Sequence, residues 1–150
     1  MRDLFTASLK DAMKTGDKRR VSTVRLITAA LKDRDIEARG AGKEPLSSDE
    51  ILALLQKMIR QRQESQTIYE QAGRAELAEQ EKEEIAIISS FLPKQMDAEE
   101  TRAAISGVIA EIGASGLRDM GKVMGVLKER FPGKMDFGKA SPLVKELLGA

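Results

Sequence analysis

The chain has 150 residues, 41% of them hydrophobic, which suffices for one compact domain or two small ones and excludes wholesale disorder. It contains no cysteine and no histidine, which excludes disulfides, thiolate zinc sites, cysteine nucleophiles and a Ser-His-Asp triad. The formal net charge is +1, yet basic residues outnumber acidic ones in 1–60 and in 113–150 but not in 61–100, which indicates polyanion contact near the two ends.

Apolar residues recur at helical spacing along the whole chain, and no stretch alternates like a β-strand, which predicts an all-α protein. A first short helix carries Leu4 and Leu9 and is expected to end at Gly16. A second helix follows over about 17–39. The segment GAGKEP (40–45) is a loop by composition.

A third, long helix is predicted to begin just after Ser47. This serine and Glu50 match a capping box, in which each side chain accepts a hydrogen bond from the other residue's backbone N–H. The second half of the helix is mostly polar (RQRQESQTIYEQ), and Ile68 and Tyr69 are expected to resume contact with the core. Gly73 breaks the pattern.

A fourth helix, about 74–89, contains the most carboxylate-rich stretch of the chain, EQEKEE (79–84). Carboxylates three or four residues apart share a helix face. A di-metal site in a helical bundle would need Glu-x-x-His pairs, and histidine is absent. We therefore interpret the stretch as a solvated or salt-bridging face, in which Glu81 and Glu84 pair with a lysine or arginine of a neighbouring helix.

The segment FLPKQMDAEE marks a boundary between two lobes. Pro93 disfavours helix at the residue before it and cannot continue a helix itself. Asp97 with Glu100 then provides an Asp variant of the capping box for the next helix. We expect an N-terminal lobe with longer helices over 1–92 and a small three-helix C-terminal lobe over 93–150.

The helices of the second lobe are predicted at about 98–112, at 118–130 and in a last segment that ends near Leu148. Proline is tolerated in the first turn of a helix, where its missing N–H would have no partner anyway. Pro142 therefore fits best in the first turn of the last helix, with Ser141 as the cap.

The helix at 118–130 holds two glycines four residues apart, Gly121 and Gly125, each costing about 1 kcal/mol relative to alanine. They are predicted to lie beside an apolar stripe, next to three cations. The stripe consists of Leu117, Met120, Met124, Leu127 and Phe131, and the cations are Arg118, Lys122 and Lys128. Glycine leaves room for another backbone. Spacing alone favours a neighbouring helix of the same lobe in that room, and the compatible alternative is a sugar-phosphate backbone held partly by charge.

Further basic residues lie near this helix and in the first helical hairpin. Lys134 and Lys139, on or near the adjacent loop, would extend the basic surface. A second basic stretch straddles the first helical hairpin, is diluted by Asp11 and Asp17, and is interpreted as a solvated face. It consists of Lys10, Lys14, Lys18, Arg19, Arg20 and Arg25. With four Phe, one Tyr and no Trp, the chain is a poor candidate for a base-stacking platform.

The sequence favours a cytoplasmic protein without membrane contact. No apolar run approaches the roughly 18–20 residues that span a bilayer. The start of the chain lacks the uninterrupted apolar segment of a secretory signal, and Asp3 and Asp11 argue against a transit peptide.

Four segments, taken in order, resemble the GatB/YqeY family over essentially the full length. They are RLITAALKDRDIEAR, YEQAGRAELAEQEKEEI, FLPKQMDAEE and DMGKVMGVLKERFPGKMDFGKASPLVKELL. The resemblance implies a YqeY-like, two-lobe, all-α protein whose C-terminal lobe is similar to the tail domain of the Asp/Glu-tRNA amidotransferase B subunit. In that enzyme the tail helps to hold tRNA while a mischarged tRNA is amidated with glutamine-derived ammonia. Carried over, this role gives Arg118, Gly121, Lys122, Gly125 and Lys128 as tRNA-facing positions, the residues that the basic helix had already selected.

We therefore predict a non-catalytic, translation-associated module that binds tRNA or another structured RNA and needs no cofactor. One alternative is a protein-interaction adaptor that docks on an amidotransferase or synthetase through the half-polar helix near 60–71. Another is an accessory component of carbon–nitrogen ligase activity with glutamine as amido-N-donor, which is the label the family often carries. The large catalytic domain and the amidase that perform that chemistry in the amidotransferase have no counterpart in this sequence.

Overall fold

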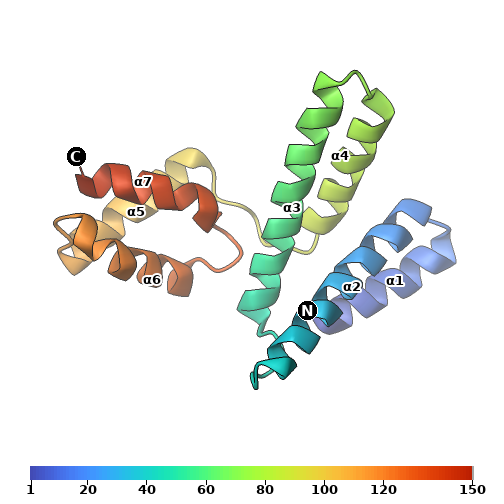
Figure 1. Cartoon of the computed structure of the whole chain (residues 1–150), viewed down its shortest axis with the longest axis horizontal. Coiled ribbons are helices and arrows are strands. Elements are labelled where there is room, and N and C mark those ends of the chain that lie inside the picture. Colours follow the sequence, from blue (N-terminus) through green and yellow to red (C-terminus); the bar gives the residue numbers. More distant parts are fainter. Residues whose placement is uncertain (150) are drawn as a thin grey trace. The chain divides into compact units, whose positions relative to one another are not determined.

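A computed structural model describes residues 1–149, and every regular element in that range is helical, which confirms the all-α prediction. The chain divides into two compact units, Met1–Leu92 and a second unit that begins at Pro93. Figure 1 shows the helices of both units, and each unit is described below by itself.

The first unit consists of two helical hairpins. Helix α1 (Arg2–Thr15) pairs with α2 (Lys18–Gly40), and α3 (Ser48–Gln71) pairs with α4 (Ala75–Ser89) (Figure 1). Helix α2 also packs on α4, which joins the hairpins around one apolar core. The largest fully buried side chains of this core are Phe5, Val24, Ile27, Leu55 and Ile88.

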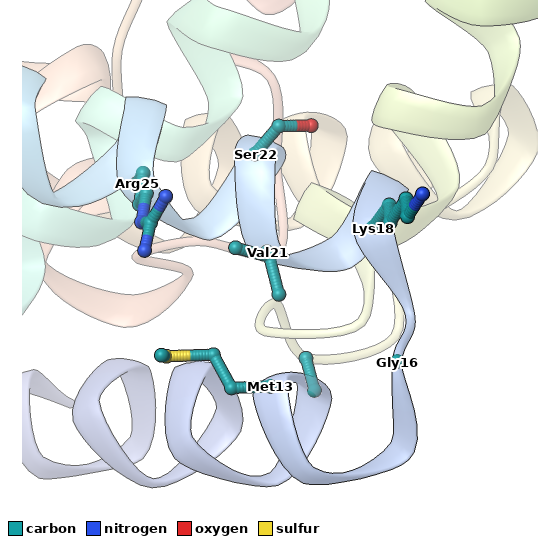
Figure 2. Close-up of a pocket in the computed structure, with 7 residues that line it drawn as sticks. Met13, Gly16, Lys18, Val21, Ser22 and Arg25 are labelled. Atoms are coloured by element: carbon teal, nitrogen blue, oxygen red, sulfur yellow. The ribbon is translucent and has the colours of Figure 1, made fainter.

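The predicted helix ends of this unit are largely confirmed. Gly16 ends α1 with a φ of 75°, a left-handed conformation that glycine adopts without steric cost. The capping box of Ser47 and Glu50 is present at the start of α3. Between the end of α1 and the start of α2 lies a groove of about 390 Å³, which Met13 and Val21 help to line (Figure 2).

The acidic helix α4 uses its carboxylates inside the fold, as predicted for Glu84. This side chain is 9% exposed and accepts a 2.9 Å hydrogen bond from Nε of Arg62, which is 15% exposed and also donates to the carbonyl of Met58. Glu83 pairs with Arg19 at 3.0 Å. Burial raises the pKa of Glu81, and the neighbouring charge of Glu84 raises it further. The stretch is therefore a salt-bridging face.

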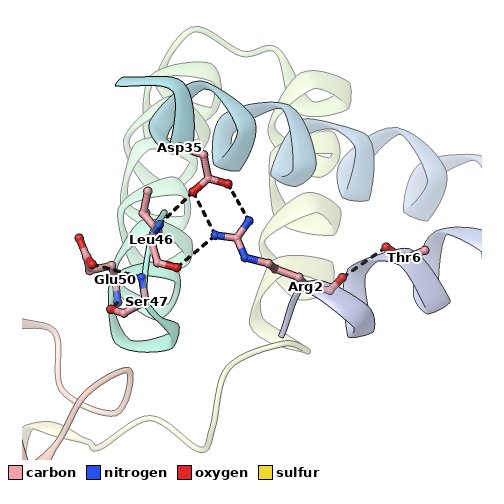
Figure 3. Close-up of polar contacts among 6 residues, drawn as sticks. All are labelled: Arg2, Thr6, Asp35, Leu46, Ser47 and Glu50. Atoms are coloured by element: carbon pink, nitrogen blue, oxygen red, sulfur yellow. Dashed lines mark hydrogen bonds and ion pairs between the residues drawn. The ribbon is translucent and has the colours of Figure 1, made fainter. Parts of the chain in front are cut away.

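A second polar cluster ties three segments of the unit together (Figure 3). The guanidinium of Arg2 donates two hydrogen bonds to Asp35, at 2.6 and 3.0 Å, and a third to the carbonyl of Leu46 at 3.1 Å. The N–H of Leu46 in turn donates to Asp35 at 2.9 Å. The hydrogen bonds from Arg2, and next that from Leu46, lower the pKa of Asp35 to about 2.

The second unit is a three-helix bundle with one additional 3-10 turn. Its elements are α5 (Ala98–Ile112), the turn η1 (Leu117–Asp119), α6 (Met120–Arg130) and α7 (Phe137–Gly149). Asp97 and Glu100 form the predicted capping box at the start of α5. The fully buried side chains come from all three helices and from the loop before α7. They include Ile105, Val123, Leu127, Met135, Ala140 and Val144.

The predicted start of the last helix is wrong. Helix α7 begins at Phe137, more than a turn before Pro142, and Asp136 caps it by accepting hydrogen bonds from the N–H groups of Gly138 and Lys139. Pro142 therefore lies inside the helix, on its exposed side. A mid-helix proline costs about 3 kcal/mol, which the burial of the apolar side of α7 offsets. Ser141 is a helical residue and not the cap.

Candidate nucleic-acid interface

The two glycines of α6 are exposed to solvent. Gly121 and Gly125 both lie within the helix with ordinary helical backbone, and a Cβ added at either position would meet no atom within 4 Å. The prediction that a neighbouring helix of the same lobe packs against them is therefore wrong. The space beside the glycines is open.

The exposure follows from which side of α6 forms the core. Val123 and Leu127 are fully buried, whereas Met120 and Met124 are only half-buried. At helical spacing Val123 and Leu127 each lie about 160° around the axis from Gly125, so that this glycine faces directly away from the core. The predicted stripe contained Leu127 but omitted Val123. Because of this omission the predicted centre of the stripe lay too near the methionines, and the glycines were predicted to lie too close to the packed side of the helix.

Leu117 was predicted to belong to the same apolar stripe, and it is half exposed at 50%. The reason is local: residues 117–119 form the 3-10 turn η1, so the α-helical projection does not extend to them. Phe131, at the other end of the stripe, is half-buried against the core of the unit.

Two cations lie beside the exposed glycines on α6, a third precedes them in the turn η1, and none of the three holds a partner within residues 1–149. Arg118, Lys122 and Lys128 are all exposed, and none forms an ion pair within residues 1–149. At helical spacing Lys122 and Lys128 each lie within about 60° of Gly125, and Arg118 lies in the turn η1 that leads into the helix. We call the surface formed by Gly121, Gly125 and these three cations the glycine face.

One carboxylate shares the glycine face, and sequence reasoning missed it. Glu129 is exposed and lies about 40° around α6 from Gly125, between this glycine and the side of Lys122. Its position follows directly from the helical projection, so the signal was present in the sequence. It lowers the positive potential at one edge of the face.

The third cation of α6, Arg130, belongs to the fold. Arg130 forms two hydrogen bonds with Glu111 of α5, at 2.6 and 2.7 Å, and thereby ties the two helices together. The hydrogen bonds from Arg130 and its charge lower the pKa of Glu111. Arg130 also lies on the opposite side of α6 from Gly121, about 180° around the axis. It is therefore a structural cation.

Five of the seven residues predicted to bind nucleic acid lie on α6 or in the turn η1 that leads into it. The other two, Lys134 and Lys139, lie on the loop after α6 and in the first turn of α7. Both side chains are exposed. The backbone carbonyl of Lys134 accepts a hydrogen bond from Met96 at 2.9 Å, which fixes the loop and leaves the ammonium group in solvent.

The described residues offer little for other chemistry. Within residues 1–149 no three acidic side chains gather closely enough to hold a metal ion. Across the same range no helix combines the length and the apolar character that crossing a bilayer requires.

Comparison with known proteins points to one family. The family model described as "Yqey-like protein" matches residues 2–148. A curated relative from Lachancea thermotolerans, altered inheritance of mitochondria protein 41, mitochondrial, is 30% identical over 106 residues. The match covers 69% of this chain and 55% of the relative, so the chain spans about half the length of the curated relative it matches.

Proposed function

We propose that this chain, which belongs to the YqeY-like protein family, is a non-catalytic tRNA-binding module associated with translation. The glycine face of α6 is the proposed contact surface, and the sugar-phosphate backbone of the RNA is its proposed ligand. The role is related to that of the tRNA-holding tail of the glutamine-dependent amidotransferase, as the sequence resemblance implies.

The open space beside Gly121 and Gly125 is the observation that carries the proposal. A glycine inside an exposed helix costs about 1 kcal/mol relative to alanine. Neither glycine has a positive φ, and neither makes room for a neighbour within residues 1–149, so the described fold does not account for this cost. A ligand backbone that approaches the helix closely would use the missing side chains.

The charges beside the glycines fit an anionic ligand. Phosphate contacts supply most of the sequence-independent affinity of nucleic-acid-binding proteins, through release of counterions. Arg118, Lys122 and Lys128 are free to supply them because no carboxylate in residues 1–149 pairs with them. Arg130 differs from them because its charge is paired with Glu111, so Lys122 and Lys128 are the cations of α6 that remain available to a ligand.

Titration of fluorescently labelled tRNA into the intact protein at low salt tests the proposal. We expect binding that weakens steeply with salt. Lys122→Glu should weaken it and reduce the slope of log K against log salt by about 1 for each phosphate that the protein no longer neutralises. Gly125→Leu should weaken binding by filling the space, without loss of the fold by circular dichroism.

Two further variants make this test sharper. Glu129→Gln removes the carboxylate from the glycine face and should strengthen binding. Lys82→Glu changes an exposed lysine of α4 in the other unit and should leave the affinity unchanged. If the intact protein bound no tRNA at low salt, or if Lys82→Glu and Lys122→Glu had equal effects, the proposal would be rejected.

The second candidate function is a protein adaptor, and one side chain favours it. Ile68, in the polar half of α3, is 61% exposed, whereas the sequence had predicted that it returns to the core. An adaptor that docks on an amidotransferase or synthetase near 60–71 would cover it. Pull-down with and without RNase separates the two functions, because an RNA-mediated association is lost after digestion and a direct one survives.

We also propose a cytoplasmic location. The name of the Lachancea thermotolerans relative places that protein in mitochondria. Fractionation of cells that express the chain from its natural gene decides between the two compartments.

A further inference from the structure

Four cations recur at seven-residue intervals along one side of α2. They are Lys18, Arg25, Lys32 and Arg39, and we call them the cation row. All four are exposed, and none forms an ion pair within residues 1–149. The other arginines of the same hairpin behave differently, since each is engaged with a carboxylate. Arg2 pairs with Asp35, Arg19 with Glu83, Arg20 with Asp17 and Arg34 with Glu37.

The spacing of the cation row has a defined geometry. Seven residues advance about 10.5 Å along an α-helix and fall about 20° short of two full turns, so the row runs almost parallel to the helix axis for about 31 Å. A second row with the same period lies beside it and changes from polar to apolar: Ser22, Ala29 and Ile36. Ile36 is 59% exposed.

One end of this surface opens into the groove between α1 and α2. Met13 extends into the groove from α1, and Val21 extends toward it from α2 (Figure 2). Met13 is 58% exposed, and Lys18 and Arg25 of the cation row also line the groove. An apolar pocket of about 390 Å³ with cations at its border therefore continues into a straight positive row.

We infer that this surface of α1 and α2 docks an acidic amphipathic helix of a partner protein. A helix that lies along α2 presents one side chain every seven residues at the same period of about 10.5 Å. Carboxylates at that period would face the cation row, and an apolar side chain at the end of the partner would enter the groove beside Met13.

The apolar side chains beside the cation row argue against a nucleic acid as the occupant. The period alone does not, because three phosphate steps of one duplex strand also advance about 10 Å along the axis. The apolar side chains that accompany the row, Met13 and Ile36, contribute nothing to phosphate binding, whereas an amphipathic helix would cover them.

The charge of the hairpin supports an acidic partner. Residues 2–40 hold ten basic and six acidic side chains, a net charge of +4. Three of the six carboxylates, Asp17, Asp35 and Glu37, are already paired with arginines of the hairpin. Asp33, next to Lys32 in sequence, lies about 100° away around the helix and does not interrupt the row.

Fluorescence anisotropy with designed peptides tests the inference on the full chain. The probe is a labelled helical peptide of about 21 residues with glutamate at every seventh position beside a row of leucine and alanine. The control peptide carries lysine in place of glutamate. The protein variant is Arg25→Glu/Lys32→Glu, and Lys82→Glu in α4 is the charge-reversal control.

We expect the acidic peptide to bind the natural chain and the Lys82→Glu variant alike, and the double reversal to bind it about tenfold or more weakly. The lysine peptide should show the opposite preference and bind the double reversal better. Met13→Asp, which places a charge in the groove, should weaken binding of the acidic peptide without restoring binding of the lysine peptide.

Three outcomes would overturn the inference. The first is absence of binding by the acidic peptide, and the second is equal binding of both peptides to the natural chain. The third is a concentration-dependent dimer that the double reversal abolishes, because the occupant would then be a second copy of this chain. The double reversal changes α2 and leaves the glycine face of α6 intact. The tRNA titration and the peptide titration therefore test the two proposals separately, and one proposal can be rejected while the other holds.

Discussion

The charged residues of α3 and α4 and those of α6 differ in where their partners lie. The first group contains a cation and a carboxylate that satisfy each other in a nearly buried position, Arg62 and Glu84. The glycine face of α6 has cations without carboxylate partners in residues 1–149, around glycines that pack against nothing. The amino-acid composition alone does not distinguish the paired charges of the first group from the unpaired cations of the second. The comparison teaches that pairing, and not charge itself, separates the residues that hold the fold from those available to a ligand.

The largest effect on stability is expected from a variant that breaks the ion pair of Arg62 and Glu84. Arg62→Ala leaves the carboxylate of Glu84 without its partner at a site only 9% exposed, which should lower the free energy of unfolding by about 3 kcal/mol. Urea denaturation followed by far-UV circular dichroism measures the change.

A double replacement supplies the control for this prediction. Arg62→Met/Glu84→Leu removes both charges and fills the space with apolar side chains, so most of the lost stability should return. Equal destabilisation by the single and the double variant would show that the ion pair itself, rather than the unpaired charge, carries the effect.

A pH-dependent effect is expected at the Arg2–Asp35–Leu46 cluster. The folded-state pKa of Asp35 is about 2 against an ordinary value of 3.8, so the unfolded chain binds this proton more readily. The stabilisation is therefore complete above about pH 5 and is lost as the pH falls through 3.8 toward 2.

Comparison of the natural chain with Asp35→Asn between pH 7 and pH 2 measures this contribution. The variant should unfold more easily near neutral pH, and the difference between the two proteins should shrink toward zero at the acidic end. A difference that stayed constant over the whole range would mean that the carboxylate charge of Asp35 is not what stabilises the cluster.

Much of this fold could be predicted because the deciding signals are local. The capping boxes of Ser47 and Asp97 and the break at Gly16 are set by neighbours a few residues away, and all three are confirmed. The start of α7 was missed because it depends on tertiary burial. Ala140 must reach the core, and that need outweighs the local preference of Pro142 for a first turn.

The candidate site was predicted less well for the same reason. The residues of the glycine face lie on α6 and in the turn η1 before it, and helical spacing places those of α6 near one another. Their exposure was not predicted, because it depends on whether Val123 or the methionines face the core of the bundle. That choice is made by α5 and α7, which are distant in sequence.

The smallest effect on stability is expected on the unpaired side, at Gly125. Gly125→Ala should raise the free energy of unfolding by up to about 1 kcal/mol, because the added Cβ meets no atom within 4 Å and alanine restricts the unfolded chain. The same variant should bind tRNA less tightly, since the methyl group occupies the space proposed for the ligand. Stability from urea denaturation and affinity from the tRNA titration should thus move in opposite directions. If both fell together, Gly125 would serve packing within the fold, and the distinction between paired and available surfaces would fail at the residue on which the proposed function depends.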